Sequence, residues 1–377
     1  MEYARAELSN GESIQNVAGF IQKIEESTSC VENENYILAY RGEPKIYPSP
    51  CRPGLFRWGK LAENEYFEKN LFNIMRQNNL TSDKNYLENA IDAQHGEFLS
   101  RLLDVSYNCL IALYFAVTPY YKIAEEEYDR EDGAVYVFYI DEIFSPAAGN
   151  IRENYGKIVN RSCGWMQEEI FHKNHKFIDH IKLNPRIIAQ QGAFILFQGD
   201  DPEPLPLCMY RMVHIPANAK KRIRNELKQF FNIHTGSIYP EISNLVNDIT
   251  NRSKFLNSKP FTLRNELALV VARLVRELDF YLENALSAKS EGNETDICCT
   301  LTQAERTIDS YRRGLIHMTE SLKNDLELQK DMNWAFEQFN REILLFTCKL
   351  EECDIGRIDA AGLLIPETKK GNGKENA

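Results

Sequence analysis

The sequence predicts an α+β fold in which a mixed small sheet with flanking helices is followed by an all-α helical bundle. Short β-branched and aromatic runs alternate with helical patterns between residues 13 and 250. From about residue 260 the pattern changes to long helical segments with few glycines. We therefore expect one domain over residues 1–255, a helical bundle over 256–365 and a disordered polar tail over 366–377.

The expected strands are runs of apolar residues that end at turn-forming or polar residues. The run 133–140 is apolar on both faces, which indicates a central strand. The run 187–197 is interrupted by Gln190-Gln191-Gly192, and a glycine inside a strand often marks a bulge. The four expected strands cover residues 36–40, 133–140, 187–197 and 209–215.

The expected helices are segments with apolar residues three and four apart. The first begins with Ser13 as a plausible N-cap, and the segment 217–230 is basic. In the first domain they cover residues 13–27, 63–77, 84–93, 109–121, 165–175, 217–230 and 237–249. In the bundle they cover residues 263–286, 301–328 and 332–350, after a joint at 251–260.

Composition narrows the class of protein. The net charge is −11 and the pI is near 5.3, which argues against a nucleic-acid binder, because phosphate contacts require a basic face. The amino terminus has no apolar signal region, and no apolar segment is long enough to cross a bilayer. Nine scattered cysteines without a CxxC pair fit reduced thiols, so we expect a cytoplasmic protein without a membrane anchor or a bound metal.

The most informative stretch is 91–121, which places a polar cluster before an apolar helix. The cluster contains Asp92, Gln94, His95, Arg101 and Asp104. Leaving a buried polar group unpaired costs about 1–3 kcal/mol, so the cluster is either a structural polar network or a site. We expect it at the start of the helix, with Asp104 as N-cap and paired with Arg101.

Four motifs in this order resemble the FRG domain, which is named for an aromatic-Arg-Gly motif. They are Tyr40-Arg41-Gly42, Gln94-His95-Gly96 with Arg101-Leu102-Leu103-Asp104, the aromatic helix that ends Ala112-Leu113-Tyr114-Phe115-Ala116, and Arg186-Ile187-Ile188-Ala189-Gln190-Gln191-Gly192-Ala193-Phe194. The resemblance covers roughly residues 13–250. The second motif departs from the family pattern, since it lacks the Pro-Thr before Arg101 and the aromatic residue after Asp104.

The resemblance implies a set of site residues rather than an established activity. FRG domains occur widely in bacteria and phages, often beside defence or toxin modules, and their motif order is similar to that of ADP-ribosyltransferases. That similarity implies catalytic roles for Arg41 and Gln191, with Glu43 as a substitute carboxylate, and NAD as the substrate. It implies that the cofactor-binding residues are Tyr40, Gly42, Gln94, His95, Arg101, Asp104 and Gln190.

Each role has a structural alternative. Arg41 suits a phosphate because its planar fork is always charged, but it could equally pair with Asp104 to hold a strand to a helix. His95 could donate to a ribose hydroxyl or bridge backbone groups. Gln191 stands where a transferase has Glu, and glutamine can donate a hydrogen bond but cannot offer negative charge or act as a base.

Two functions remain open from the sequence. The first is an NAD-using ADP-ribosyltransferase or glycohydrolase, acting in defence or as a toxin, with C-terminal helices for sensing or oligomerisation. The second is a non-catalytic module that binds a nucleotide or a protein. The expected partners are a nucleotide ligand in the first domain, and a protein partner or a second copy of the chain on the C-terminal helices.

Overall fold

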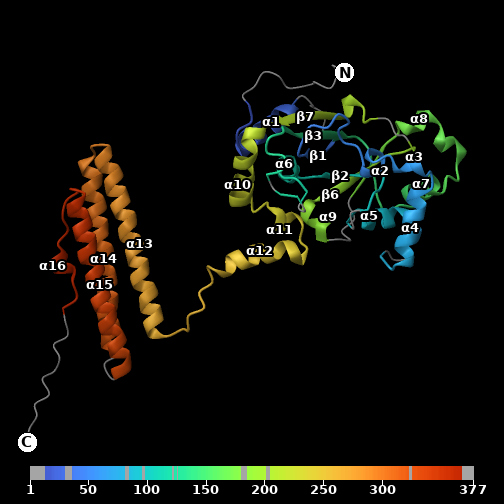
Figure 1. Cartoon of the computed structure of the whole chain (residues 1–377). Helices are drawn as coiled ribbons and strands as arrows, with labels where there is room; N and C mark the ends of the chain where they lie inside the picture. Colours follow the sequence, from blue (N-terminus) through green and yellow to red (C-terminus); the bar gives the residue numbers. More distant parts are fainter. Residues whose placement is uncertain are drawn as a thin grey trace, which may run out of the picture. The chain divides into compact units, whose positions relative to one another are not determined.

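A computed structural model of the chain describes residues 13–29, 36–80, 85–95, 98–120, 123–124, 126–179, 185–200, 204–321 and 325–366. The chain divides into two compact units, residues 1–255 and residues 256–377. The predicted α+β class is confirmed, because a sheet with helices is followed by a helical region (Figure 1). No helix among the described residues is long and apolar enough to cross a membrane.

In the first unit the described residues form a seven-stranded mixed sheet in the order β4-β5-β6-β2-β1-β3-β7. All neighbours are antiparallel except β4 and β5, which are parallel. The strands are β1 (Ile37–Glu43), β2 (Leu102–Ser106), β3 (Gly133–Ile140), β4 (Ile143–Phe144), β5 (Lys176–Ile178), β6 (Gly192–Leu196) and β7 (Tyr210–Ile215). The prediction for β3 is confirmed to the residue, and all eight of its side chains are buried.

Helices cover both faces of this sheet. The N-terminal ones are α1 (Val17–Ser29), α2 (Gly54–Arg57), α3 (Lys60–Glu63), α4 (Phe67–Gln77), α5 (Tyr86–His95) and α6 (Cys109–Val117). After β4 come α7 (Gly149–Asn160), η1 (Gly164–Gln167), α8 (Glu169–His172) and α9 (Pro185–Gln190). The last are η2 (Leu207–Met209), η3 (Ala217–Ala219), α10 (Lys220–Phe231), α11 (Thr235–Ile238) and α12 (Ile242–Ser253).

The core helix α6 lies unusually close to the sheet because two glycines leave room for it. A Cβ added to Gly42 would lie 1.8 Å from the carbonyl oxygen of Ala112, and one added to Gly133 would lie 2.3 Å from that of Ala116. Only glycine fits at such a close approach of two backbones. The glycine of the Tyr40-Arg41-Gly42 motif is therefore needed for helix packing.

The predicted position of the polar cluster was wrong. Asp104 lies in the middle of β2, and the helix begins five residues later, where the side chain of Asn108 accepts a hydrogen bond from the amide of Leu110. Asp104 is therefore not an N-cap, and Arg101 does not pair with it locally. The predicted N-cap of the first helix was also wrong, since Asn16 accepts from Gly19 N at 2.8 Å.

The predicted strand over 187–197 was also wrong in its first half. Residues Pro185–Gln190 form α9, and the strand begins only at Gly192. Gln191 joins the two elements with a positive φ of 47°, which ends the helix in the left-handed region. The amides of this segment thus belong to a helix end, and no bulge interrupts β6.

The described residues of the C-terminal unit form three long helices and a short fourth one. They are α13 (Leu263–Ser290), α14 (Glu294–Ser321), α15 (Leu326–Glu352) and α16 (Ala360–Leu363). Their shared core contains Leu274, Ile308, Phe339 and Ile343, which are all fully buried. Among the described residues the core of this unit has no member from the first unit, and each unit therefore buries apolar residues of its own.

Candidate functional site

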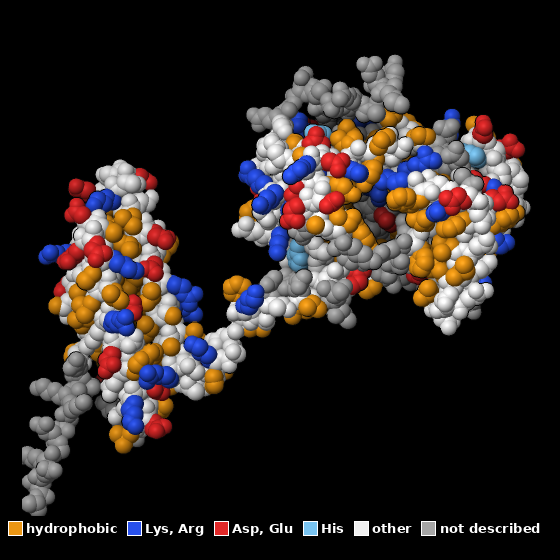
Figure 2. Space-filling view, viewed as in Figure 1, with side chains coloured by type: hydrophobic (Ala, Val, Ile, Leu, Met, Phe, Trp, Pro, Cys, Tyr) orange, Lys and Arg blue, Asp and Glu red, His pale blue; other side chains and the backbone are white. Residues whose placement is uncertain are grey.

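A cavity of about 480 Å³ opens where the sheet splits between β1 and β2. These two strands share a single pair of residues, Tyr40 and Ser106, whereas β1 pairs with β3 along its whole length. The two strands diverge beyond Tyr40, and the cavity lies between them. Figure 2 shows a hollow in this unit with an acidic side chain inside it and basic side chains nearby.

Arg41 bridges the split. Its Nη1 donates to the backbone carbonyl of Asp104 at 2.7 Å, and its Nε donates to Glu43 Oε1 at 3.3 Å. Burial lowers the pKa of the guanidinium, but Glu43, Cys51 and Asp104 raise it by more, so the group stays charged. Among the described residues none accepts from its Nη2, so Arg41 keeps two donors for a ligand in the cavity.

Asp104 presents the carboxylate of this site. Its side chain is exposed to the cavity although protein atoms surround it closely, so it is both accessible and poorly hydrated. This burial raises the pKa of the carboxyl, and the charges of Arg41 and Arg186 offset only part of the effect. In the described part of the chain no group donates a hydrogen bond to the carboxylate. It is therefore available to a ligand.

The remaining walls are largely aromatic. Burial raises the pKa of the Tyr40 phenol to about 12, so this ring is neutral. Tyr239 meets Phe115 and Tyr120 edge to face, with ring centroids 6.2 and 6.1 Å apart. The aromatic residues on the walls are Tyr40, Tyr47, Phe98, Phe115, Tyr120, Tyr128 and Tyr239. Such walls suit a planar ring.

Another wall of the cavity is formed by α9 and the segment after α11. The Ser106 hydroxyl donates to the carbonyl of Gln190 at 2.7 Å, which joins β2 to the end of α9. Gln190 Nε2 donates to the carbonyl of Ile238 at 3.3 Å. Arg186 faces the cavity from α9, with its Nε 2.8 Å from Glu241 Oε1 and its guanidinium 5.0 Å from the centre of the Tyr239 ring.

Several predicted site residues meet at this cavity. It is lined by Tyr40, Arg41, Gly42, Gln94, Asp104 and Gln190. Gln94 also ties α5 to β2, since its Nε2 donates to the carbonyl of Leu102 at 2.8 Å. His95 is the last residue of α5, and its side chain lies outside the described residues.

Glu43 lies beside the cavity and does not line it. Its side chain is 2 % exposed, and Oε1 accepts from Arg41, from Arg57 Nη2 at 3.4 Å and from Cys51 N at 3.2 Å. These contacts join the end of β1 to the proline-rich loop that covers it. The structure thus gives Glu43 a position in which it orients Arg41 and holds the loop.

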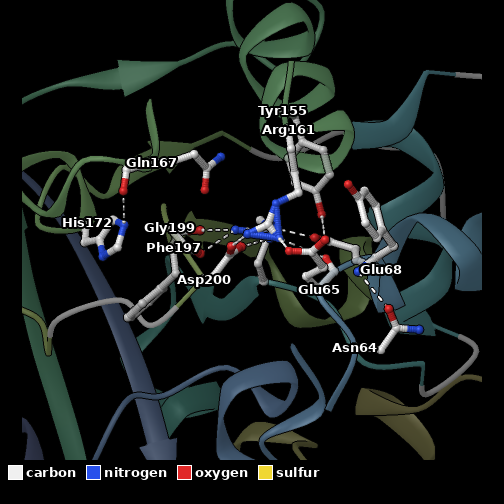
Figure 3. A network of polar contacts seen from close by, with 12 residues as sticks. Asn64, Glu65, Glu68, Tyr155, Arg161, Gln167, His172, Phe197, Gly199 and Asp200 are labelled. Atoms are coloured by element: carbon white, nitrogen blue, oxygen red, sulfur yellow. Dashed lines mark hydrogen bonds and ion pairs between the residues drawn. The ribbon is translucent and has the colours of Figure 1, made fainter. Parts of the chain in front are cut away.

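Arg101 belongs to a separate buried network. It is 1 % exposed, and its Nε lies 2.7 Å from Glu68 Oε2 while Nη1 donates to the carbonyl of Gly199 at 2.8 Å. Figure 3 shows Glu68 between Tyr155 and the guanidinium groups, with Asp200 on the other side. This network joins α4 and α7 to the end of β6, and Arg101 does not reach the cavity.

Gln191 does not line the cavity either. Its side chain is exposed, and its backbone carbonyl accepts from the amide of Tyr107 at 2.9 Å. Its left-handed φ turns the chain from α9 into β6. The resemblance therefore aligned a turn residue with the carboxylate of a transferase, whereas Asp104 is the carboxylate that the cavity presents among the described residues.

Arg186 and Tyr239 are two cavity residues that the sequence analysis did not assign to the site. Arg186 begins the motif that contains Gln190, and an arginine four residues before that amide, on one face of a helix, was a usable signal. Tyr239 precedes a proline in an ordinary-looking connection and reaches the cavity only through the packing of α11 against α9. No local pattern distinguishes it.

The fold is an α+β domain with a partly open cavity at a split in its sheet. A family profile of the FRG domain matches residues 36–124, and the chain therefore carries an FRG domain. That range includes β1, β2 and α6, and with them Arg41 and Asp104, whereas Arg186 and Gln190 lie beyond it. Searches of curated proteins and of solved structures found no match.

Proposed function

We propose that the FRG-containing unit binds a nucleotide in the cavity between β1 and β2, with NAD as the candidate ligand. The observation that carries this proposal is the placement of the Arg41 donors and the Asp104 carboxylate on facing strands, within an aromatic enclosure. Arginine suits a phosphate, the carboxylate suits a sugar hydroxyl, and an aromatic wall suits a base. The volume of about 480 Å³ lies in the range of roughly 300–1,000 Å³ of small-molecule sites.

Titration calorimetry of the purified full-length protein with NAD, ADP-ribose and adenosine monophosphate tests this function. We expect Arg41→Lys to weaken binding about tenfold or more, because lysine keeps the charge but loses the planar pair of donors. Lys221→Ala, an exposed change on α10, is the control and leaves the affinity unchanged. Equal affinities in wild type and Arg41→Lys would refute the assignment of the site.

A second candidate function is cleavage of the bond between nicotinamide and ribose. The observation that favours it is the accessible carboxylate of Asp104, since cleavage passes through an oxocarbenium-like species that a nearby negative charge stabilises. In this reading Asp104 has the role that the family resemblance gave to Gln191. The bond between the anomeric carbon and the nicotinamide nitrogen breaks, nicotinamide leaves with the bonding electrons, and water or another nucleophile adds to the carbon.

Nicotinamide release from NAD can be measured to decide whether Asp104 or Gln191 has the catalytic role. We expect release to be abolished in Asp104→Asn and retained in Gln191→Asn, which keeps a residue that tolerates the left-handed backbone at that position. Loss of release in Gln191→Asn with retention in Asp104→Asn would contradict this assignment. Binding without release by wild type would leave nucleotide binding as the function of the domain.

A further inference from the structure

The open carboxylate of the cavity wall indicates which part of a ligand it recognises. The side chain of Asp104 is exposed and lines the cavity, and no group among the described residues donates a hydrogen bond to it. Gln94 Oε1 and Thr118 Oγ1 also lack partners among the described residues, but both atoms are buried within the wall. A carboxylate accepts hydrogen bonds and donates none, so the Asp104 side chain is complementary to a ligand group that supplies donors.

The second cation of the cavity is already committed to protein partners. Arg186 is held by Glu241 from one side and lies over the Tyr239 ring. Its charge is therefore partly neutralised, and it offers little additional attraction for an anionic group. Arg41 is the donor group left for a phosphate, and its Nη1 contacts the backbone carbonyl of Asp104 itself. A phosphate on Arg41 would thus lie a short distance from whatever the Asp104 carboxylate binds.

We propose that Asp104 recognises the vicinal hydroxyls of a ribose, so that the site selects ribonucleotides over nucleotides without these hydroxyls. This inference rests on the proposed nucleotide function and names the group that the site reads. A carboxylate has two oxygens in one plane and accepts from two neighbouring hydroxyls at once. In a nucleotide the ribose adjoins the phosphate, as the Asp104 carboxylate adjoins Arg41.

The position of Asp104 on the strand favours direct recognition. The residue lies two places before Ser106 on β2, so both side chains point to the same face of the strand, and both line the cavity. The strand is fixed on either side, by Arg41 on the carbonyl of Asp104 and by pairing of Asp104 with Phe194 on β6. The backbone that carries the carboxylate is therefore held in place before a ligand arrives, which reduces the ordering cost of binding.

The test compares adenosine monophosphate with its 2′,3′-dideoxy analogue, binding to wild type, Asp104→Asn and the Lys221→Ala control. In wild type we expect the ribonucleotide to bind about 10- to 150-fold tighter than the dideoxy analogue, as for hydrogen bonds to a charged acceptor. In Asp104→Asn the two ligands should bind with nearly equal affinity. In Lys221→Ala the ratio should equal that of wild type.

Inosine monophosphate, which lacks the amine of adenine, distinguishes a ribose donor from a base donor. Binding equal to that of adenosine monophosphate supports the ribose assignment, whereas weaker binding, with no loss for the dideoxy analogue, overturns it. If wild type and Asp104→Asn both bind adenosine monophosphate and its dideoxy analogue equally well, the inference is overturned, and the proposed nucleotide binding still stands. If neither NAD nor adenosine monophosphate binds wild type, the proposed function fails and the inference fails with it.

Discussion

At the level of single residues, the cavity contains an acidic side chain in a place where its charge is unfavourable for folding. The side chain of Asp104 is exposed only within a cavity lined by protein atoms, and desolvation there raises the pKa of its carboxyl above the ordinary 3.8. Any stability that this group contributes is complete below that value and is lost as the pH rises through the raised pKa. A carboxyl group whose pKa is raised in this way, and whose charge lowers the stability of the fold at neutral pH, is typical of a functional site.

Replacing the charge should therefore separate stability from binding. We expect Asp104→Asn to raise the thermal midpoint at pH 7 while it weakens nucleotide binding, because the desolvated charge is gone from the fold and from the ligand contact. The difference in midpoint should shrink as the pH falls through the raised pKa. Differential scanning calorimetry between pH 4 and 7 measures this, and a lower midpoint for the variant at pH 7 would show that the carboxylate supports the fold.

At the element scale, the cavity exists because close packing of α6 holds β1 against β3 while β1 and β2 separate. Gly42 allows this packing, since a Cβ there would lie 1.8 Å from the carbonyl oxygen of Ala112. The backbones of α6 and β1 cannot move apart without moving β1 relative to the strands that pair with it. The glycine of the motif therefore acts on the site through the position of its strand.

Gly42→Ala should destabilise the first unit by about 3 kcal/mol or more, since overpacking against backbone cannot be relieved by a rotamer change. The matched control is Gly314→Ala in the exposed middle of α14, where a Cβ would meet nothing. There we expect stabilisation of about 0.5–1 kcal/mol, because alanine is the better helix former. Urea unfolding measures both changes, and a neutral Gly42→Ala would disprove the close approach.

The first turn of α10 holds the loops beside the cavity. Lys220 is buried, and its Nζ donates to the backbone carbonyls of Pro44 and Tyr128, both of which line the cavity. Burial lowers the pKa of this amine to about 8. The positive charge of Arg224 also lowers it, whereas the carboxylates of Asp129, Asp132 and Glu131 raise it and offset part of the effect. The folded protein therefore binds fewer protons than the unfolded chain between about pH 8 and 10.5.

It follows that the stability contributed by Lys220 rises with pH in that window. We expect the free energy of unfolding of wild type to increase relative to that of Lys220→Met by up to roughly 3 kcal/mol between pH 8 and 10.5. The comparison with the variant removes the other groups that titrate there. Unfolding curves at several pH values measure the difference, and a gap that stays constant with pH would contradict the burial of this amine.

Some of these helices and strands could be predicted from sequence patterns and others could not. The strand over 133–140 was predicted to the residue because every position is apolar and Gly133 marks its start. Asp104 was misplaced because a polar residue before an apolar helix resembles a cap, although the true cap, Asn108, follows closely. The strands β4 and β5, of two and three residues, are too short to carry a periodic signal.

The candidate site was predictable in its parts but not in its geometry. Tyr40, Arg41, Gln94 and Gln190 were found from the family resemblance, and they do meet at one cavity. Arg101 was grouped with them because it lies three residues from Asp104, yet successive strand residues point to opposite faces and its side chain joins another network. The split between β1 and β2 is a property of the whole sheet, which no local pattern encodes.

At the scale of the whole molecule, the two units have separate cores. The polar network around Arg101 and Glu68 stabilises the first unit, where both side chains are almost fully buried. The described core of the second unit is built from helices α13 to α16 and from Ile355, Ile358 and Ile365 in the segments beside α16. A change in one core should therefore leave the stability of the other unit unaltered.

Arg101→Ala tests this separation. It leaves the carboxylate of Glu68 buried without its cation, so we expect the unfolding transition of the first unit to lose about 3–5 kcal/mol. Arg222→Ala, which breaks an exposed pair on α10, should change stability by less than about 1 kcal/mol. Calorimetry of the full chain should show a second transition that neither variant moves, and a common shift of all transitions would show that the units unfold as one.

Titration calorimetry of the purified full chain with NAD and adenosine monophosphate decides whether the cavity between β1 and β2 binds a nucleotide. The proteins compared are wild type, Arg41→Lys, Asp104→Asn and Lys221→Ala. The cavity between β1 and β2 predicts binding by wild type and Lys221→Ala, and a loss of about tenfold or more in both cavity variants. Binding that is unchanged in Arg41→Lys and Asp104→Asn would place the ligand elsewhere, and no binding by the folded wild type would contradict a nucleotide site.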